Sequence, residues 1–392
     1  MRADMLDRHA YSIAALRRLA QRRLPRLVFD FVDGGAEDER TLRRNEAIFG
    51  ETLFLPSPLN GTTRRDQSVE LFGQRLSGPI LTGPTGLAGL MWPRGEAASA
   101  RAATAAGSVY TMSHASTVSI EDLAREVGGN LWMQVFVYRD RGLTRSFAER
   151  AHAAGYKALV LTVDNQMPGY RERDVRNGFT VPLRLGLGNV FDMALHMRWL
   201  LRMARARRFT FANYAQEGKS DIMSLAARMG SMLAPDLTWK DVEAVRSMWD
   251  RPLLLKGILH PEEARRAVAL GVDGIIVSNH GGRQLDAVPT SIEALSGVLD
   301  AVAGRVPVLI DGGIRRGSDV LKALALGARA CLIGRPQLWG LAVAGQEGVA
   351  WALELYRREI DRVMGLCGWD RLADVDRSVL FVPTTRGSVR SE

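Results

Sequence analysis

Short apolar runs alternate with stretches of helical periodicity along most of the chain. Several of the helical stretches end in glycine, which is a helix-stop signal. Eight such runs in series, each followed by a helical stretch, predict an α/β protein whose parallel strands close into a (β/α)8 TIM barrel. The predicted strands lie at residues 79–83, 108–113, 131–136, 157–164, 252–257, 274–279, 306–313 and 330–334.

The pattern departs from even spacing in two places. Residues 1–75 precede the first strand and look helical, with the first 23 residues forming one amphipathic helix. We therefore expect an N-terminal helical cap, a barrel over residues 76–372 and a C-terminal tail over residues 373–392. The connection from the fourth to the fifth strand is far longer than a crossover needs, which predicts an insertion over about residues 174–235.

Composition narrows the class of protein. The chain has 392 residues, 46% of them hydrophobic and 24% charged, which is typical of globular proteins. A net charge of +9 indicates an anionic partner such as a small carboxylate or phosphate, a membrane surface, or nucleic acid. No zinc-finger, RNA-recognition or basic-zipper pattern is present, so nucleic acid is not expected.

The cysteines and the N-terminus bear on the compartment. Cys331 and Cys367 are the two cysteines, and neither has a metal-ligand spacing. We therefore expect no disulfide framework and no metal site, in a reducing cytoplasm. The N-terminus does not read as a signal peptide, and no run reaches the roughly 18 apolar residues of a spanning helix.

Glycines and arginines follow the last two predicted strands. Asp311 and Gly313, with Arg315, end the seventh strand, and Gly334 and Arg335 end the eighth. Glycine-rich loops at this place are the usual phosphate site of the barrel, because phosphate oxygens can approach backbone N–H groups and a helix N-terminus. Tight turns with solvated arginines are the alternative, but the two loops together favour a phosphate site.

Polar side chains also end the middle strands. Lys256 closes the apolar run of the fifth strand, where a buried ammonium needs an anion or a lowered pKa. It could form a Schiff base or stabilise negative charge on a cofactor ring. Ser113, Gln134 and Thr162 end neighbouring strands and suit the polar edge of a flat heterocycle. With one phosphate site they suggest flavin mononucleotide, since no GxGxxG follows a strand to support a dinucleotide.

The run SNHGGRQLD, residues 278–286, follows the sixth strand and places His280 and Arg283 around two glycines. A simple turn with a surface histidine and a solvated arginine is one interpretation. The C-terminal end of a strand is, however, where this barrel builds its sites. His280 and Arg283 are therefore candidate functional residues.

These motifs resemble one family. SNHGGRQLD, GPTG, LTVD followed by GYRERD, KGIL and DGGIRRGSDVLKALALGA are similar to the FMN-dependent (S)-2-hydroxy acid oxidases and dehydrogenases. The resemblance begins at LPRLVFDFVDGG and runs to the end of the barrel. PTGLAGLMWPRGE and LTWKDVEAVRSMWDRPLLLKGIL are most similar to the membrane-associated (S)-mandelate and L-lactate dehydrogenases. The resemblance implies FMN as cofactor and oxidation of an (S)-2-hydroxy acid to the 2-oxo acid.

The resemblance also implies a role for each matching residue. His280 matches the base that takes a proton as the substrate is oxidised, and Asp164 matches its partner carboxylate. Arg283 and Arg171 match the residues that grip the substrate carboxylate. Lys256 would face the N1/O2 edge of the flavin and stabilise the reduced ring. The other cofactor-binding residues implied are Pro84, Thr85, Gly86, Ser113, Gln134, Thr162 and Ser278, with Asp311, Gly313, Arg315, Gly334 and Arg335 toward the ribityl chain and phosphate.

Two substrate positions depart from the family pattern. Phe31 and Phe136 stand where most members carry tyrosines whose hydroxyls point at the substrate. Hydrogen bonds to charged groups contribute roughly 1.5–3 kcal/mol each, so we expect weak activity on glycolate or lactate. A bulkier, apolar or aromatic acid is favoured. The alternative is that Phe136 belongs to the core and Tyr138, on the same face of the strand, compensates.

Residues 181–210, within the insertion, combine six arginines with many large apolar residues, among them Trp199. A basic amphipathic segment with an interfacial tryptophan suits an anionic bilayer. A helix packed on the barrel or an oligomer contact is the alternative. The matching loop of membrane-bound relatives favours peripheral attachment at the cytoplasmic side of the inner membrane, with a membrane quinone as electron acceptor.

Other activities stay open at this point. An oxidase of the same fold would pass electrons to oxygen and form hydrogen peroxide, although Gly86 matches the mandelate dehydrogenase branch where oxidases often carry alanine. A different FMN barrel activity is disfavoured by the intact set of His280, Arg283, Asp164 and Arg171, as is a non-enzymatic scaffold. Barrel relatives are often tetramers, so we expect a homotetramer.

Overall fold

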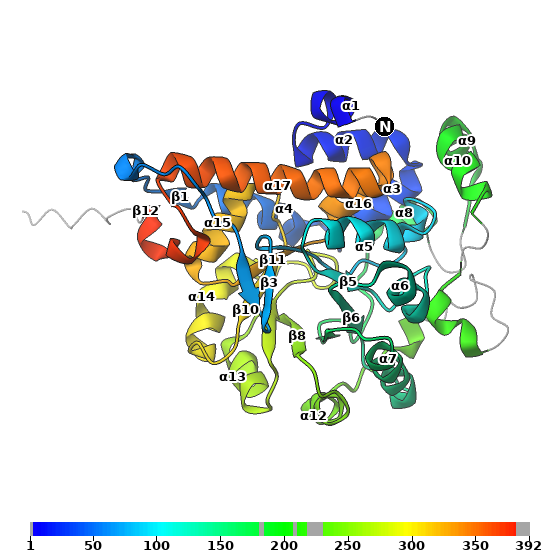
Figure 1. The fold of residues 1–392 in the computed structure, drawn as a ribbon. Coiled ribbons are helices and arrows are strands. Elements are labelled where there is room, and N and C mark those ends of the chain that lie inside the picture. The colour runs from blue at the N-terminus through cyan, green and yellow to red at the C-terminus, as the bar shows by residue number, and fades with distance from the viewer. Residues whose placement is uncertain (1–2, 180–183, 207–209, 218–229, 382–392) are drawn as a thin grey trace, which may run out of the picture.

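Eight parallel strands form a closed barrel at the centre of the molecule (Figure 1). The computed structural model describes residues 3–179, 184–206, 210–217 and 230–381. Consecutive strands are neighbours, and the last pairs with the first, with Cys331 opposite Ile80. The predicted (β/α)8 barrel is confirmed. Its strands are β4 (Ile80–Thr82), β5 (Tyr110–Met112), β6 (Leu131–Val135), β7 (Ala158–Thr162), β8 (Leu253–Ile258), β9 (Gly274–Val277), β10 (Val308–Asp311) and β11 (Ala330–Ile333).

The strands are continuous apolar runs because helices cover them from outside and side chains fill the barrel within. All five residues of β6 and of β7 are buried. Capping sets several helix boundaries: Thr290 and Glu293 form a capping box at one N-terminus, and Gly327 ends another helix at φ +117°. The surrounding helices are α5 (Gly95–Ala105), α6 (Ile120–Val127), α7 (Arg141–Ala153), α12 (Trp239–Met248), α13 (Pro261–Ala269), α14 (Ser291–Val302), α15 (Gly317–Leu326), α16 (Arg335–Ala344) and α17 (Gln346–Cys367).

The N-terminal segment covers one end of the barrel with α1 (Ala3–His9), α2 (Ile13–Arg23), α3 (Arg26–Asp33) and α4 (Arg40–Ala47). The single helix expected over the first 23 residues is instead two, because Ser12 caps α2 by accepting a hydrogen bond from the Ala15 N–H at 3.1 Å.

Helical structure over residues 1–75 also ends earlier than expected. After residue 50 the segment forms β1 (Leu53–Phe54) and a hairpin of β2 (Val69–Leu71) with β3 (Gln74–Leu76). Near the other end of the chain, β12 (Leu380–Phe381) pairs antiparallel with β1. The described part of the predicted tail therefore folds back onto the N-terminal segment.

The predicted insertion contributes α8 (Glu172–Arg176), α9 (Leu187–Leu195) and α10 (Met197–Ala204), and α9 and α10 project to one side in Figure 1. Parts of this insertion (180–183, 207–209 and 218–229) and of the tail (382–392) lie outside the described residues. In the described ranges, no helix has both the length and the apolar character to cross a membrane.

One expectation for the insertion is wrong. Trp199 is only 9% exposed, and its indole N–H donates to the Leu90 carbonyl at 2.8 Å. Arg202 stacks on Trp92 at 3.8 Å from its ring centroid. Trp199 therefore attaches α10 to the barrel instead of facing a membrane. The exposed apolar side chains of this region are Leu185, Leu187, Val190, Phe191, Leu195, Met197, Leu200 and Leu201.

Candidate active site

A cavity of about 400 Å³ lies at the C-terminal ends of the barrel strands, under the N-terminal helices. It brings together all the site residues predicted from the sequence except Asp164 and Ser278. Those two lie behind the wall, where Asp164 contacts His280 and Ser278 contacts Lys256. Residues from all eight strand ends thus meet in one place, as expected for this barrel.

The loop after β9 has an unusual backbone that explains its glycines. His280, Gly281 and Gly282 have φ values of +57°, +64° and +71°. A Cβ on Gly282 would lie 2.7 Å from the Leu42 nitrogen, and one on Gly281 would lie 2.9 Å from Arg335. For His280 the left-handed conformation costs about 1–3 kcal/mol. The Ser278 hydroxyl offsets part of this strain by accepting the His280 N–H at 3.0 Å.

His280 and Asp164 form a half-buried pair. The Nδ1 atom of His280 lies 2.8 Å from an Asp164 carboxylate oxygen. Burial acts to raise the pKa of Asp164, but the neighbouring His280 and Lys256 outweigh it and hold that pKa below its usual value. Because Nδ1 faces the carboxylate, the other ring nitrogen is left for the cavity. A Cβ on Gly257 would approach Asp164 to 2.6 Å, so glycine there makes room for the pair.

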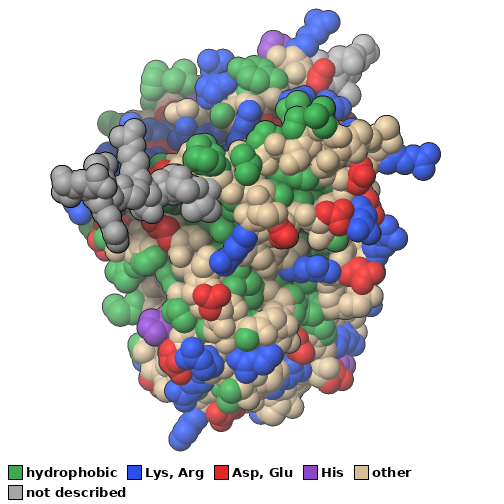
Figure 2. Space-filling model, turned by 90° about the vertical axis from the view of Figure 1, so that its left-hand side faces the viewer, with side chains coloured by type: hydrophobic (Ala, Val, Ile, Leu, Met, Phe, Trp, Pro, Cys, Tyr) green, Lys and Arg blue, Asp and Glu red, His purple; other side chains and the backbone are tan. Residues whose placement is uncertain are grey.

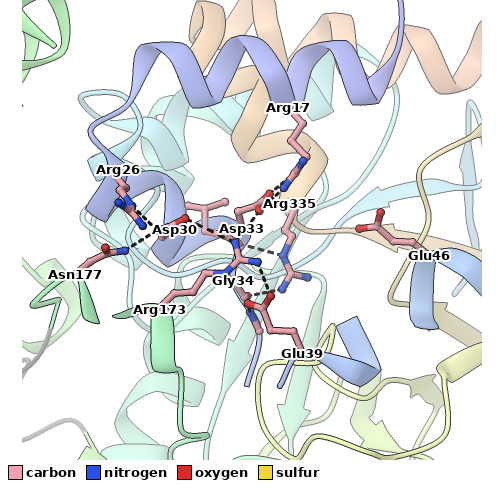
Figure 3. Close-up of polar contacts among 12 residues, drawn as sticks. Arg17, Arg26, Asp30, Asp33, Gly34, Glu39, Glu46, Arg173, Asn177 and Arg335 are labelled. Carbon is pink, nitrogen blue, oxygen red and sulfur yellow. Dashed lines mark hydrogen bonds and ion pairs between the residues drawn. The ribbon is translucent and has the colours of Figure 1, made fainter. Parts of the chain in front are cut away.

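Two arginines of the cavity donate hydrogen bonds to backbone carbonyls. Both Arg283 and Arg335 donate to the carbonyl of Gly34, each at 2.8 Å, and both also contact the Val32 carbonyl. Figure 3 shows Arg335 beside Gly34. Burial and neighbouring arginines lower the pKa of both guanidiniums, that of Arg335 to about 10. No carboxylate bonds either guanidinium in the part of the chain that the structure describes, so both sites favour an anionic ligand.

Arg171 lies on the same wall, next to the start of α8. It forms an ion pair with Asp174, 3.3 Å away. Asp174 also lines the cavity, and burial raises the pKa of its carboxyl. Arg171 and Arg283 are thus two cations within one cavity, which suits a carboxylate held by both.

A polar network fixes α8 against the N-terminal helices (Figure 3). Arg173 bonds Glu39 and lies 3.3 Å from Asp33. Asp33 in turn receives two hydrogen bonds from Arg17, each 2.6 Å long. Asn177 donates to Asp30 at 2.6 Å. These contacts connect the elements that carry Arg171 and the Gly34 carbonyl, and so fix their relative positions.

The barrel strands β6, β7 and β10 bring unpaired polar atoms to the cavity. Gln134 Nε2, Thr162 Oγ1 and Asp311 Oδ1 are buried and have no hydrogen-bond partner among the described residues. Lys256 Nζ donates to Ser278 at 2.8 Å and pairs with Asp311 at 3.0 Å. Burial opposes the charge on Lys256, yet Asp311 and Asp164 raise its pKa. A protonated lysine does not suit a Schiff base but does suit a ring edge that carries negative charge.

The predicted phosphate loops are present, with differences in detail. Gly313 packs on the N-terminal segment, where a Cβ would overlap the Asn45 carbonyl oxygen at 1.8 Å. This glycine is therefore required by packing. Arg315 lines the cavity but pairs with Glu46 at 2.8 Å. Arg335 is the phosphate candidate without a carboxylate partner in the described ranges.

Tyr138 does not compensate for the phenylalanine at position 136. Its side chain is buried, and its hydroxyl bonds His114 and Tyr214, each at 2.8 Å. Phe136 itself lines the cavity. The alternative in which Tyr138 replaces the missing hydroxyl in the cavity is therefore wrong.

The cavity also contains residues to which the sequence assigned no role, namely His114, Asp174, Phe179 and Phe211. Asp174 had a usable signal, because it follows Arg171 by three residues on a helix. Phe179 and Phe211 belong to the insertion, and no local sequence pattern marks them as cavity residues. Phe179 packs on Phe31 with ring centroids 4.6 Å apart.

Comparison with known proteins gives the family. A model of FMN-dependent dehydrogenases matches residues 20–382. The chain belongs to the FMN-dependent dehydrogenase family. It is 43% identical over 363 residues to (S)-mandelate dehydrogenase of Pseudomonas putida, which covers 93% of this chain and 92% of that one. It is also 43% identical to L-lactate oxidase of a Nostoc species, over 93% of this chain and 96% of that one.

Solved structures agree. The crystal structure of the monotopic membrane protein (S)-mandelate dehydrogenase superposes with a TM-score of 0.92 at 42% identity, covering 95% of this chain and 99% of that chain. The resemblance to the family, and to its mandelate and lactate dehydrogenases, is confirmed. The protein therefore depends on FMN. The unpaired atoms of Gln134 and Thr162, beside a protonated lysine, fit the polar edge of that flavin, and the unpaired Asp311 oxygen fits a hydroxyl of its ribityl chain.

Proposed function

We propose that the protein oxidises an (S)-2-hydroxy acid with a bulky or aromatic side chain, of which (S)-mandelate is the model, to the 2-oxo acid. The observation that supports this most directly is that His280, which pairs with Asp164, lines the same cavity as Arg171 and Arg283. A base and two cations at one site suit a small acid that must lose a proton while its carboxylate is held.

Each residue of this set has a defined task. Arg283 and Arg171 bind the substrate carboxylate and so orient the carbon that is oxidised. His280 takes a proton at its free ring nitrogen, and ionised Asp164 stabilises the imidazolium that results. FMN, when bound, supplies the electron acceptor for this oxidation. The cofactor would be held by Lys256, Ser113, Gln134 and Thr162 at its ring, by the loop Pro84–Gly86, and by Asp311, Gly313, Gly334, Arg335 and Arg315 toward its phosphate, with Ser278 behind Lys256.

The aromatic walls support a bulky substrate. Phe31, Phe136, Phe179 and Phe211 line the cavity, and none of them can offer a hydroxyl to a small acid. A phenyl or long alkyl group gains by burial against such rings, at about 25 cal/mol per Å² of apolar surface. Glycolate has no side chain and gains nothing from these walls.

The exposed apolar side chains of α9 and α10 support peripheral membrane attachment. Leu187 is 90% exposed and Phe191 is 67% exposed. Arg198 and Arg205, which are exposed, add positive charge suited to an anionic bilayer. A relative of 42% identity is named as a monotopic membrane protein. We propose that the protein attaches to the cytoplasmic side of the inner membrane as a homotetramer and passes its electrons to a membrane quinone.

An oxygen-using oxidase is the second candidate, since one relative at 43% identity is an L-lactate oxidase. Gly86 is the local feature that bears on it. A Cβ at this position would lie 3.2 Å from the Ala115 Cβ. The glycine leaves open the space that an alanine methyl would fill in this flavin-facing loop.

The deciding experiment is anaerobic reduction of the purified protein by a panel of 2-hydroxy acids, followed by the loss of visible flavin absorbance. Fast bleaching by (S)-mandelate, slow bleaching by glycolate and slow reoxidation in air are expected. Equal rates for glycolate and mandelate would contradict the aromatic substrate. Rapid reoxidation with formation of hydrogen peroxide would replace the dehydrogenase by the oxidase.

A further inference from the structure

His114 is a buried imidazole at the end of β5, in contact with two tyrosine hydroxyls. Its Nδ1 atom lies 2.6 Å from the hydroxyl of Tyr214 and 2.8 Å from that of Tyr138. The two hydroxyls are 2.8 Å apart, so the three polar atoms form a triangle. The edge of the imidazole packs on Phe136, with ring centroids 4.5 Å apart. The ring is thus fixed on both sides.

The charge of this ring follows from its surroundings. Burial, with a smaller contribution from His280, lowers the pKa of His114 to about 3, so the ring is neutral at physiological pH. Either tyrosine hydroxyl can donate to Nδ1, and the second hydroxyl can donate to the first. The contacts thus accommodate the tautomer in which Nδ1 is an acceptor and the single ring proton is on Nε2.

The Nε2 edge of the ring faces the cavity. Of the three groups in the triangle, His114 is the one that lines the cavity among the described residues. Because its Nδ1 edge is turned to the tyrosines, the opposite edge with Nε2 is the one turned to the ligand. The ring that it packs on at this wall, Phe136, has no polar side-chain atom.

The two substrate-facing walls differ in charge. Arg283 stacks on Phe31, with its guanidinium carbon 5.4 Å from the ring centroid, so the Phe31 wall is where the carboxylate binds. His114 lies against Phe136. An acid whose carboxylate is held by Arg283 and Arg171 has one other polar atom, the oxygen on the carbon that is oxidised, here called the α-oxygen.

We infer that His114 donates its Nε2 proton to the α-oxygen of the bound acid, and that Tyr138 and Tyr214 are positioning residues that hold the ring and its proton in place. This inference rests on the proposed function. The α-oxygen gains negative charge while His280 removes a proton, and a neutral donor stabilises that charge without attracting a second carboxylate. His114 thereby gives polarity to a wall of phenylalanine side chains and favours acids over their deoxy analogues.

The test uses two amides that separate the ring nitrogens. His114→Asn places its amide near the position of Nδ1 and removes the Nε2 donor, whereas His114→Gln can reach the position of Nε2. We expect His114→Asn to slow anaerobic flavin reduction by (S)-mandelate about 10- to 100-fold, as for loss of a hydrogen bond to a charged group. His114→Gln should recover most of this loss, and Tyr214→Phe should show a smaller loss of the same kind.

Binding of unreactive acids provides a readout that a purely structural role would not produce. Phenylglyoxylate has an α-oxygen and phenylacetate has none, and both can be titrated through the visible flavin spectrum. His114→Asn should weaken phenylglyoxylate binding about 10-fold or more and leave phenylacetate binding unchanged. Equal weakening of both, or of neither, would overturn the inference.

Two controls keep the outcomes separate. Flavin content and melting temperature report whether each variant folds and keeps FMN. Reduction of the unaltered protein by (S)-mandelate is measured first. If no hydroxy acid reduces it, the proposed function is wrong. If the unaltered protein is reduced and His114→Asn behaves identically, the inference alone is wrong.

Discussion

The strand ends of the barrel bury charged side chains, whereas α9 and α10 expose apolar ones. At the strand ends Lys256 is buried between two carboxylates and Arg283 rests on backbone carbonyls. In α9 no residue is buried. The side of the molecule that carries β1 and α14 resembles neither, because acidic, basic and apolar side chains are interspersed there (Figure 2).

Both arrangements are unfavourable in water alone, since buried cations need counter-charges and apolar patches need cover. The difference indicates what each region suits as a ligand. The strand ends suit an anion and a flavin, and α9 and α10 suit an apolar surface. Substitutions in the two regions should therefore change different measurements.

The largest effect is expected at the base. His280→Asn should lower the rate of anaerobic flavin reduction about 10²- to 10⁴-fold, because general base catalysis contributes that much. Flavin content should stay the same. His152→Asn, at an exposed histidine on another face of the barrel, serves as the control. If the His280→Asn variant is reduced at a rate within threefold of that of the unaltered protein, His280 is not the catalytic base.

Lys256→Met should have the next largest effect, on stability. It leaves Asp311 without its buried partner and removes a neighbouring cation from Asp164, which costs about 3–5 kcal/mol. The pKa of Lys256 is raised on folding, so its contribution is fully present below the unfolded pKa of about 10.4 and is lost as the pH rises through the folded value. Urea unfolding at pH 7 and pH 9 should therefore give the same deficit. Lys240→Met, at an exposed lysine, should cause none.

Arg283→Lys keeps the charge but removes the planar fork. We expect kcat/KM for the hydroxy acid to fall about 10- to 100-fold through lost bonds to the carboxylate. For the neutral amide of the same acid, kcat/KM should fall much less. Arg265→Lys, at a surface arginine, should leave both rates unchanged.

The smallest effect belongs to the insertion. Phe191→Ser should raise the amount of anionic vesicle needed for half-binding about 10-fold, because one large apolar side chain no longer enters the interface. Flavin reduction in solution should be unaffected. Leu59→Ser removes another fully exposed apolar side chain, and should not change vesicle binding. If both variants bind vesicles equally, the exposed apolar side chains of α9 and α10 do not contribute to membrane binding.

Much of the fold and most of the site could be predicted from the sequence. The barrel strands are apolar on both faces, and the residues that end them converge because parallel strands end at one rim. That is why His280, Lys256 and Gln134, distant in sequence, could be assigned to one cavity. The pairing of His280 with Asp164 was expected from the family resemblance.

What could not be predicted depends on contacts between distant segments. Periodicity showed that α10 is amphipathic, but it could not show that Trp199 faces Leu90. The two-residue strands β1 and β12 have no local signal, since their pairing is set by the packing of both ends of the chain. The contacts of His114 likewise involve Tyr214, a residue of the insertion about a hundred positions away.

The carbonyls of Val32 and Gly34 restrict which segments of this enzyme can be exchanged by recombination. They lie at the C-terminal end of α3, the negative end of its dipole, and they serve Arg283 and Arg335 together. A barrel moved to another scaffold without these helices would keep every strand end and yet lose the shared acceptor of both cations. The N-terminal segment and the barrel therefore form one inherited unit, and recombination between relatives should succeed when the crossover leaves α3 with its own β9 and β11 loops.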